Sequence, residues 1–256
     1  AASLMIALAL TLAIEITVRS FRRTFELWMD QAVTADLYLE PAQEGGPPLT
    51  PALLSRLRAL PAVADLAVLR SRRVLVGERE VLLLALDLPA FARHSAIPAV
   101  GLTPAEAFAR LEGGALWVSE PLAYPLGLRA GDRLALATPA GPHELPIGAV
   151  VQNYSAPQGL LYLSSQRFAA LFGPAPPQRA ALWLRPGADP AQVRALLERM
   201  PELQALQVHP NAALRSDALR IFDRTFAITD VMGALAAFVA FLAVVSALTA
   251  QLEERM

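Results

Sequence analysis

Two long apolar runs stand at opposite ends of the chain, and a mixed pattern of polar and apolar positions lies between them. Val231–Ala250 contains no charged residue. A helix of this length would be roughly 30 Å long, which is the thickness of the hydrocarbon layer of a bilayer. Met5–Ile14 is a shorter run of the same kind. We expect a membrane crossing within residues 1–18 and a second within residues 230–250.

Each crossing has an alternative interpretation. The second run is also compatible with a buried core helix, although such helices are seldom this long and apolar on all faces. The first run is also compatible with a signal peptide, but no basic segment precedes it and no cleavage site follows it. Because the sequence opens at Ala1 without an initiator Met, we expect the first helix to be truncated and the chain to be a fragment of a longer protein.

An amphipathic stripe continues from each apolar run towards the middle of the chain. Apolar residues recur at helical spacing in residues 19–34 and again in residues 214–229. We expect these segments to form paired stalk helices, and two ordinary surface helices are the alternative. The stripe residues expected to pack are Phe21, Phe25, Trp28, Leu219, Phe222 and Phe226.

Glu15 directly follows the first apolar run and stands four residues before Arg19. An ionisable residue at membrane depth is a functional candidate by default. The spacing of four residues places the two side chains on one helix face. We therefore interpret Glu15 and Arg19 as an ion pair at the membrane interface.

Residues 35–213 alternate between strand and helix patterns. Helix starts are marked by Thr50 followed by Pro51 and by Asp189 followed by Pro190. Two β-rich runs flank Gly77-Glu78, which predicts a hairpin. The order β-α-β-β…α-β predicts an α+β domain with a ferredoxin-like split βαβ part.

The middle of this domain, about residues 95–176, is predicted to be an inserted mixed α/β subdomain. Thr103 and Glu106 form a capping-box pattern at the start of a helix. Strands are predicted in ALWVSE, DRLALATP, ELPIGAVVQNY and LLYLS, and a short helix in SQRFAALFG.

Composition excludes several kinds of chemistry. The chain contains no Lys, so every Lys or Arg position is Arg, and it also contains no Cys. A P-loop and a Schiff-base lysine are therefore absent from this sequence, as are thiolate nucleophiles and disulfides. The net charge of −1 argues against nucleic acid as a partner.

No motif in the sequence indicates catalysis. The three histidines, His94, His143 and His209, are widely separated, and no nucleophile elbow or zinc-protease motif occurs. We predict no catalytic residue, no metal site and no cofactor.

The order of these parts resembles the FtsX-like permeases, which are membrane subunits of ABC transporters of the macrolide-exporter and lipoprotein-release type. LGLRAGDRLAL (126–136) and WLRPGADPAQVRALLERM (183–200) are similar to recurrent segments of their periplasmic core domain. The resemblance implies a multi-pass protein of the bacterial inner membrane with its central domain on the periplasmic or extracellular side.

The resemblance also implies partners. Residues 251–256 would begin a cytoplasmic coupling segment, in which Gln251, Glu253, Glu254 and Arg255 contact an ATP-binding subunit. A second permease copy or half, the lipid bilayer and envelope proteins are further expected partners. ATP hydrolysis would then occur in the partner subunit, and rigid helices would carry its effect to the outer domain.

Two other functions remain compatible with the pattern. One is a transmembrane receptor with an extracytoplasmic sensor domain that feeds a signalling module inside the cell. The other is a membrane-tethered hydrolase, which requires histidine and acidic side chains to converge in one pocket of the outer domain.

Overall fold

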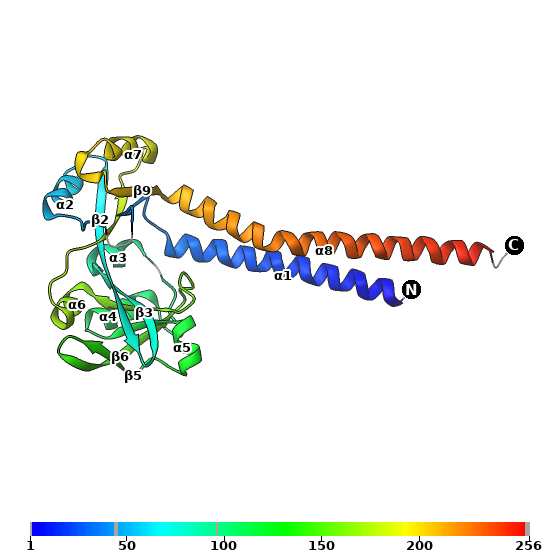
Figure 1. The fold of residues 1–256 in the computed structure, drawn as a ribbon, viewed down its shortest axis with the longest axis horizontal. Helices are drawn as coiled ribbons and strands as arrows, with labels where there is room; N and C mark the ends of the chain where they lie inside the picture. The colour runs from blue at the N-terminus through cyan, green and yellow to red at the C-terminus, as the bar shows by residue number, and fades with distance from the viewer. Residues whose placement is uncertain (1, 44–45, 96, 254–256) are drawn as a thin grey trace. The chain divides into compact units, whose positions relative to one another are not determined.

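The computed structural model describes residues 2–43, 46–95 and 97–253. The chain divides into two compact units, and Figure 1 labels their helices and several of their strands. The helix unit comprises residues 1–29 and 214–256, and the domain unit comprises residues 30–213.

The helix unit is built from the two longest helices, α1 (Ala2–Ala32) and α8 (Asn211–Glu253). Among the described residues, no helix has both the length and the apolar character required to cross a membrane. Most side chains of Met5–Ile14 and Val231–Ala250 lie outside the described part of the chain. The two crossings therefore stay predictions.

The domain unit contains a mixed sheet of nine strands in its described residues, in the order β5-β6-β4-β7-β3-β2-β8-β1-β9. The strands are β1 (Leu37–Pro41), β2 (Val63–Val76), β3 (Arg79–Leu86), β4 (Leu116–Ser119), β5 (Arg133–Thr138), β6 (Gly141–Val151), β7 (Leu160–Ser164), β8 (Arg179–Leu184) and β9 (Leu206–Pro210). The helices are α2 (Pro51–Arg58), α3 (Leu88–His94), α4 (Pro104–Glu112), α5 (Glu120–Leu126), α6 (Ser165–Phe172), α7 (Pro190–Glu198) and the 3₁₀ helix η1 (Pro201–Leu203).

One half of the sheet confirms the predicted ferredoxin-like part. Strands β2, β8, β1 and β9 are neighbours, and each adjacent pair is antiparallel. Helices α2 and α7 contribute Leu53, Leu57, Val193 and Leu197 to one core with these strands. Chain order β1-α2-β2…β8-α7-β9 with this strand order is the split βαβ arrangement.

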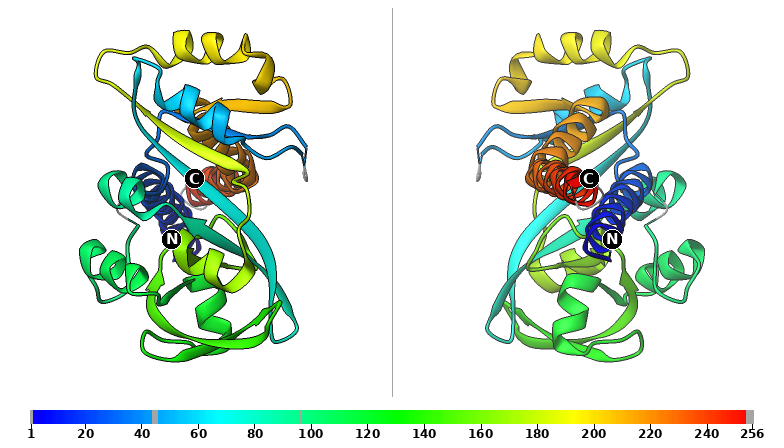
Figure 2. Two further views of the ribbon diagram at one scale, coloured as in Figure 1. Left: turned by 90° about the vertical axis from the view of Figure 1, so that its left-hand side faces the viewer. Right: turned by 90° about the vertical axis from the view of Figure 1, so that its right-hand side faces the viewer.

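The inserted subdomain begins earlier than the predicted position of about residue 95. Strand β2 runs on from β8 into a hairpin with β3, and β3 then pairs in parallel with β7. Both views of Figure 2 show β2 in cyan extending through the two halves of the domain. The hairpin turns at Gly77-Glu78, as predicted, but its second strand belongs to the insertion because its sheet partner does.

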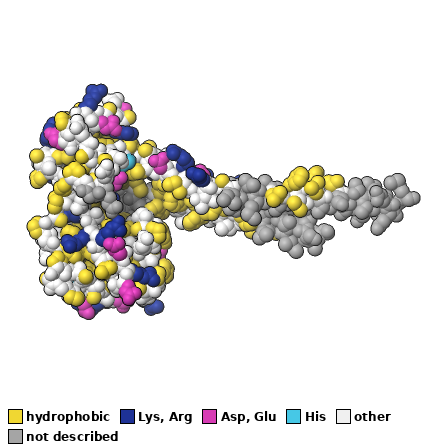
Figure 3. Space-filling view, viewed as in Figure 1, with side chains coloured by type: hydrophobic (Ala, Val, Ile, Leu, Met, Phe, Trp, Pro, Cys, Tyr) yellow, Lys and Arg dark blue, Asp and Glu magenta, His cyan; other side chains and the backbone are white. Residues whose placement is uncertain are grey.

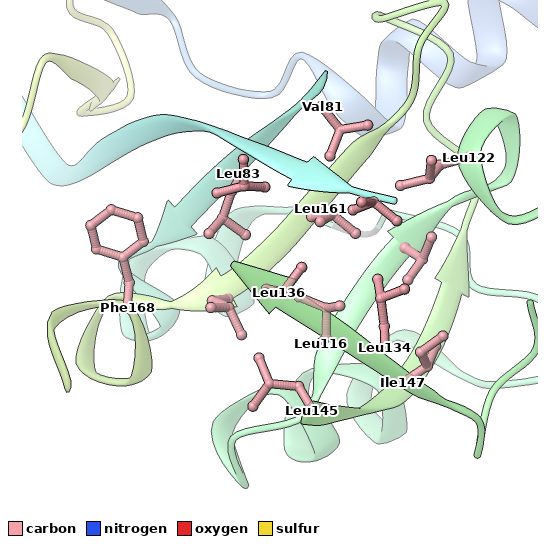
Figure 4. Close-up of a cluster of buried hydrophobic side chains, with 14 of the residues drawn as sticks. Val81, Leu83, Leu116, Leu122, Leu134, Leu136, Leu145, Ile147, Leu161 and Phe168 are labelled. Carbon is pink, nitrogen blue, oxygen red and sulfur yellow. The ribbon is translucent and has the colours of Figure 1, made fainter. Parts of the chain in front are cut away.

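Strand β3 is apolar on both faces because each face packs in a hydrophobic core. Along β3, Val81, Leu83 and Ala85 enter one core, whereas Leu82, Leu84 and Leu86 pack in another. The first core also takes Phe168 from α6 and Leu122 from α5, and Figure 4 shows these side chains converging with those of the strands. The run VLLLAL therefore reads as a continuous apolar segment.

Predicted helix caps are formed at three places. The Thr50 hydroxyl accepts from the Leu53 amide, and the Asp189 carboxylate accepts from the Ala191 amide. Thr103 and Glu106 form a reciprocal capping box. Helices α3 and α5 were not predicted, and the second begins at Glu120, which the sequence pattern places at the end of a strand.

Candidate functional site

The predicted stalk residues form an aromatic cluster inside the helix unit. The Phe21 ring on α1 lies 5.5 Å from the Phe222 ring and 5.9 Å from the Phe226 ring on α8. Phe25 stacks on Phe222 at 5.6 Å, with 19° between the ring planes. Such ring pairs add to the free energy gained by burying apolar surface. α1 and α8 thus contact each other through the stripes that the sequence identified.

The other two predicted stalk residues are Trp28 and Leu219. Trp28 stacks on Phe25 of its own helix at 5.7 Å. Leu219 is partly buried on α8. Phe222 is the most enclosed ring, with 8% of its surface exposed.

The sequence pattern did not predict an ion pair that joins α1 and α8. The Arg22 guanidinium lies 3.0 Å from the Asp223 carboxylate. It also donates a hydrogen bond to the Glu26 carboxylate one turn further along α1. Asp223 follows Phe222 directly, so its charge borders the aromatic cluster. The pairing of Arg22 with Glu26 is visible in the sequence, but a partner on another helix has no sequence signal.

Glu15 and Arg19 are paired at 2.5 Å, and both side chains are exposed within the described part of the helix unit. The pairing agrees with the expected spacing, whereas its position at a membrane interface stays a prediction. Gln251, Glu253, Glu254 and Arg255 lie outside the residues whose side chains are described.

The domain unit brings its first and last segments together. β1 and β9 are antiparallel, and Leu37 at the start of β1 lies opposite Pro210 at the end of β9. Residues 30–36 and 211–213 therefore emerge from neighbouring positions on one strand pair. We call this place the junction.

Asn211 holds the two chain segments of the junction together. Its side-chain amide donates to the carbonyl oxygens of Val33 and Ala35, both at 2.8 Å. Its backbone amide donates to the Asp36 carbonyl oxygen at 2.9 Å. These three bonds join segments that are far apart in sequence, and the role of Asn211 could not be read from composition or periodicity.

Two further side chains tie the junction to the sheet. The Asp36 carboxylate accepts from the Leu184 amide on β8 at 2.7 Å. The Tyr38 hydroxyl accepts from the Ala35 amide at 3.1 Å, and burial raises the pKa of Tyr38 to about 12. The junction is thus hydrogen-bonded to β8 and to β1 itself.

The histidines do not converge in one pocket of the described domain. His94 lies 2.9 Å from Asp65, which also accepts from Arg93 at 2.7 Å. His143 lies beside Arg167, and His209 lies 3.1 Å from Glu40. Among the described residues, no group of three metal-ligating side chains is present.

The cluster around Asp65 attaches α3 to β2. The His94 ring also stacks on Trp183 of β8, with the ring centroids 4.3 Å apart. Burial alone would raise the pKa of Asp65, but hydrogen bonds from Arg93 and His94 hold it below its ordinary value of 3.8. A carboxylate held by two cation-forming side chains is suited to fixing a helix rather than to proton transfer.

A pocket of about 580 Å³ lies beside α5 in the inserted subdomain. Its lining includes Glu120 and Tyr124 of α5, Arg129 of the following turn, Val150 of β6, and Val100. Sequence reasoning did not identify it. No histidine is among the described residues that line it.

Comparison with known proteins identifies a relative by sequence. No model of a known protein family matches the chain. The chain is 27% identical, over 256 residues, to an uncharacterised ABC transporter permease protein of Mycobacterium tuberculosis. The match covers 96% of this chain and 30% of the relative, so the chain spans less than a third of that protein's length.

Two solved structures match with TM-scores below 0.5. The periplasmic region of MacB from Actinobacillus actinomycetemcomitans matches with a TM-score of 0.46 and 9% identity, over 73% of this chain and 94% of that one. The extracellular domain of the noncanonic ABC-type transporter YknZ from Gram-positive bacteria matches with a TM-score of 0.41 and 14% identity, over 69% of this chain and 99% of that one.

The relative found by sequence is named as a permease component of an ABC transporter. The chain is similar over nearly its whole length to part of such a permease, and the resemblance predicted from its sequence is confirmed.

Proposed function

We propose that the chain forms the outer domain and the two flanking membrane helices of a permease subunit of an ABC transporter. The observation that carries the proposal is the sequence match to a permease, which extends over the helix unit as well as the domain unit. The subunit would lie in the bacterial inner membrane, with the domain on the periplasmic or extracellular side. A separate ATP-binding subunit would supply the enzymatic activity.

The junction supports a mechanical role for the domain. Its two chain segments leave from facing positions on β1 and β9, and Asn211 bonds them across three backbone positions. A movement of one segment against the other must therefore stretch or shear a hydrogen-bonded strand pair. Packed cores and strand pairs resist small displacements, so such a movement is passed on rather than absorbed.

The aromatic cluster supports coupling between the two helices. Phe21 and Phe25 contact Phe222, while Arg22 pairs with Asp223 on the rim. A shift that starts at the inner end of one helix would thus move the other helix as well. Binding of ATP by the partner subunit would act at the coupling segment that contains Gln251, Glu253, Glu254 and Arg255.

The outer domain would then export or release a substrate, or regulate another envelope protein. A second permease copy or half would complete the assembly. On the face drawn in Figure 3, Arg side chains are interspersed with Asp and Glu side chains. This mixed surface and the net charge of −1 do not favour nucleic acid as the partner.

The test replaces Phe21, Phe25 and Trp28 by Ala together in the full permease, reconstituted with its ATP-binding subunit. Removal of these rings uncouples the helices, so we expect transport or release driven by ATP to fall by at least about tenfold, a change of about 1.4 kcal/mol in coupling. ATP hydrolysis itself should persist, because the nucleotide site lies in the other subunit.

The matched control replaces Leu12, Ile16 and Leu27 by Ala, since these apolar side chains of α1 are exposed in the described helix unit. Coupled activity should survive in this control. Unchanged coupling in the aromatic variant would contradict the mechanical role. Isolation of the full protein with a kinase module instead of an ATP-binding subunit would favour the receptor.

A further inference from the structure

The pocket beside α5 has walls that are fixed by backbone hydrogen bonds. Helix α5 is capped by Gly127, whose φ of 65° lies in the left-handed region, and the Leu128 amide donates to the Ala123 carbonyl oxygen at 3.0 Å. The next turn is held by a bond from the Arg129 amide to the Asp132 carboxylate at 2.7 Å. This wall therefore does not depend on a ligand for its shape.

Two further backbone hydrogen bonds fix segments that line the pocket or adjoin it. The Val100 amide donates to the Val150 carbonyl oxygen on β6 at 2.8 Å, which holds the segment around Val100 beside the sheet. The Gly131 amide donates to the Ile147 carbonyl oxygen at 2.8 Å, which attaches the α5–β5 turn to the same strand. A preformed cavity of about 580 Å³ is within the range that small-molecule sites occupy.

Glu120 supplies a carboxylate to this cavity. Its side chain is 5% exposed, and it accepts a hydrogen bond from the Tyr154 hydroxyl. Desolvation of the phenol and, to a smaller extent, the neighbouring carboxylate raise the pKa of Tyr154 to about 12. The phenol therefore keeps its proton and donates. Within the described part of the domain, Glu120 makes no ion pair.

Among the described side chains, the neutral Tyr154 hydroxyl is the donor to the Glu120 carboxylate, so acceptor positions on the carboxylate stay available. Ionised carboxylates have about four acceptor positions, and buried charges in proteins are ordinarily paired with an opposite charge. Arg129 also lines the cavity, but its side chain is exposed and its charge is screened by water. The position beside Glu120 thus favours a cation that enters from outside.

The rest of the pocket suits an apolar body attached to that cation. Ala123, Leu128 and Val150 line the interior. Tyr124 and Val100 also line the pocket, and they are 76% and 49% exposed. Aromatic faces attract organic cations as well as apolar groups.

We propose that this pocket binds a small amphipathic amine, with its protonated nitrogen at the Glu120 carboxylate and its apolar part between α5 and β6. The site lies inside the domain unit and does not depend on ATP-driven coupling. It would place a ligand-binding function in the outer domain, separate from the junction and from the aromatic cluster.

The alternative is that Glu120 and Tyr154 only attach the loop 152–159 to α5. The two interpretations differ in their response to charge and to the Tyr154 hydroxyl. Glu120→Gln keeps the shape and an acceptor for Tyr154, but it removes the charge. Tyr154→Phe removes the bond between loop and helix but leaves the charge free to bind an amine.

The test measures binding of phenethylamine to the full chain in lipid nanodiscs by isothermal titration calorimetry, with empty nanodiscs subtracted. 2-Phenylethanol and phenylacetate serve as neutral and anionic probes of similar size. We expect phenethylamine to bind at least about tenfold more tightly than either probe, because only the amine pairs with the buried charge.

Variants then locate the site. Glu120→Gln should weaken phenethylamine binding by at least about tenfold, whereas Tyr154→Phe should retain it. Glu112→Gln, an exposed carboxylate on α4, is the matched control and should bind like the natural chain. Ala130→Trp fills part of the cavity without changing charge and should also abolish binding.

Three outcomes would overturn the proposal. These are equal binding of all three probes, no binding of phenethylamine at millimolar concentration, and unchanged binding in both Glu120→Gln and Ala130→Trp. Hydrogen exchange of α5 in each variant shows whether the domain remains folded. Loss of ATP-driven coupling in the aromatic variant would leave this result unaffected.

Discussion

At the scale of single residues, two glycines with positive φ differ in what surrounds them. Gly159 has φ of 86°, and a Cβ atom there would lie 2.4 Å from the Leu122 Cβ atom. Gly131 has φ of 98°, and a Cβ atom there would meet open space. Both positions resist a side chain because the left-handed region is unfavourable for L-residues, but only the first adds a collision with α5.

We therefore expect Gly131→Ala to lower the free energy of unfolding by about 1–2 kcal/mol. Gly159→Ala should lower it by at least about 3 kcal/mol, because strain and a core collision combine. Urea denaturation of the two variants, followed by circular dichroism, makes the comparison. Equal losses would show that the 152–159 loop moves away from Leu122 without penalty.

A second prediction at this scale concerns pH. The folded pKa of Asp65 lies below 3.8, so the bonds from Arg93 and His94 stabilise the fold above that pH. This contribution is lost as pH falls through the folded pKa. Asp65→Asn should lower the free energy of unfolding by about 1–2 kcal/mol at pH 7, and this difference should shrink as the pH falls below 3.8 through the folded pKa of Asp65.

The measurement is the urea midpoint of both proteins between pH 7 and pH 3. Glu198→Gln removes an exposed carboxylate that pairs with Arg194 on the same helix, and it is the control for loss of a surface ion pair. A constant difference between the Asp65→Asn variant and the natural chain over the whole range would show that Asp65 does not titrate within this cluster.

At the scale of elements, the contact between α1 and α8 is open to a chemical test. The natural chain contains no Cys, so a double substitution introduces the only two thiols. Phe21→Cys with Phe222→Cys should react rapidly with dibromobimane, which fluoresces when it bridges two thiols. The rings at these positions lie 5.5 Å apart, and their replacement leaves room for the short bridge.

The control pairs Phe21→Cys with Ile221→Cys. Ile221 is 68% exposed on α8 and precedes Phe222, so it lies on a different face of the helix. Bridging of the control as fast as the test pair would contradict the observed facing of the two helices. Both reactions are carried out on the full chain in nanodiscs.

A helix could be predicted from the sequence when its pattern was formed by residues close together along the chain and was not interrupted. The helix caps made by Thr50 and Thr103 involve residues within four positions of each other, and they form as expected. Helix α5 was missed because Pro121 and Pro125 interrupt its pattern and its seven residues complete only about two turns. The stripes of α1 and α8 were recognised because they repeat over several turns.

The candidate site follows the same division. The aromatic residues of the helix unit were predicted because helical spacing alone aligns them. The junction and the α5 pocket were not predicted, because sheet order creates them. Val100, Glu120 and Val150 come from separate segments, and the parallel pairing of β4 with β6 brings the last two to one site. No single-sequence pattern specifies that pairing.

At the scale of the whole molecule, the insertion leaves the ferredoxin-like part and returns to it at one place, between the paired strands β2 and β8. Leu69 on β2 lies opposite Arg179 on β8, and the Gln178 amide donates to the Leu69 carbonyl oxygen at 3.2 Å. Arg70 and Gln178 would therefore be the flanking residues of a tight turn if the intervening residues were absent. The ferredoxin-like core draws its side chains from outside residues 71–177.

This geometry predicts that the ferredoxin-like part folds without the insertion. In a chain of residues 30–213, Asn-Gly replaces residues 71–177, because that dipeptide favours the two-residue turn that the strands require. We expect cooperative unfolding in urea and a mixed helix–strand circular dichroism spectrum. The free energy of unfolding should be small, since a domain of this size buries little apolar surface.

Trp183 reports what the insertion covers. It is 6% exposed, and Phe91 and His94 of α3 lie against it at 6.2 Å and 4.3 Å between ring centroids. It is the only tryptophan left in the shortened chain, and residues 30–213 with Trp117→Phe give the matched reference. Its emission should shift to longer wavelength in the shortened chain, because water replaces α3. A cooperative fold with unshifted emission would show that α3 does not shield it, and the absence of cooperative unfolding would show that the two halves of the sheet fold only together.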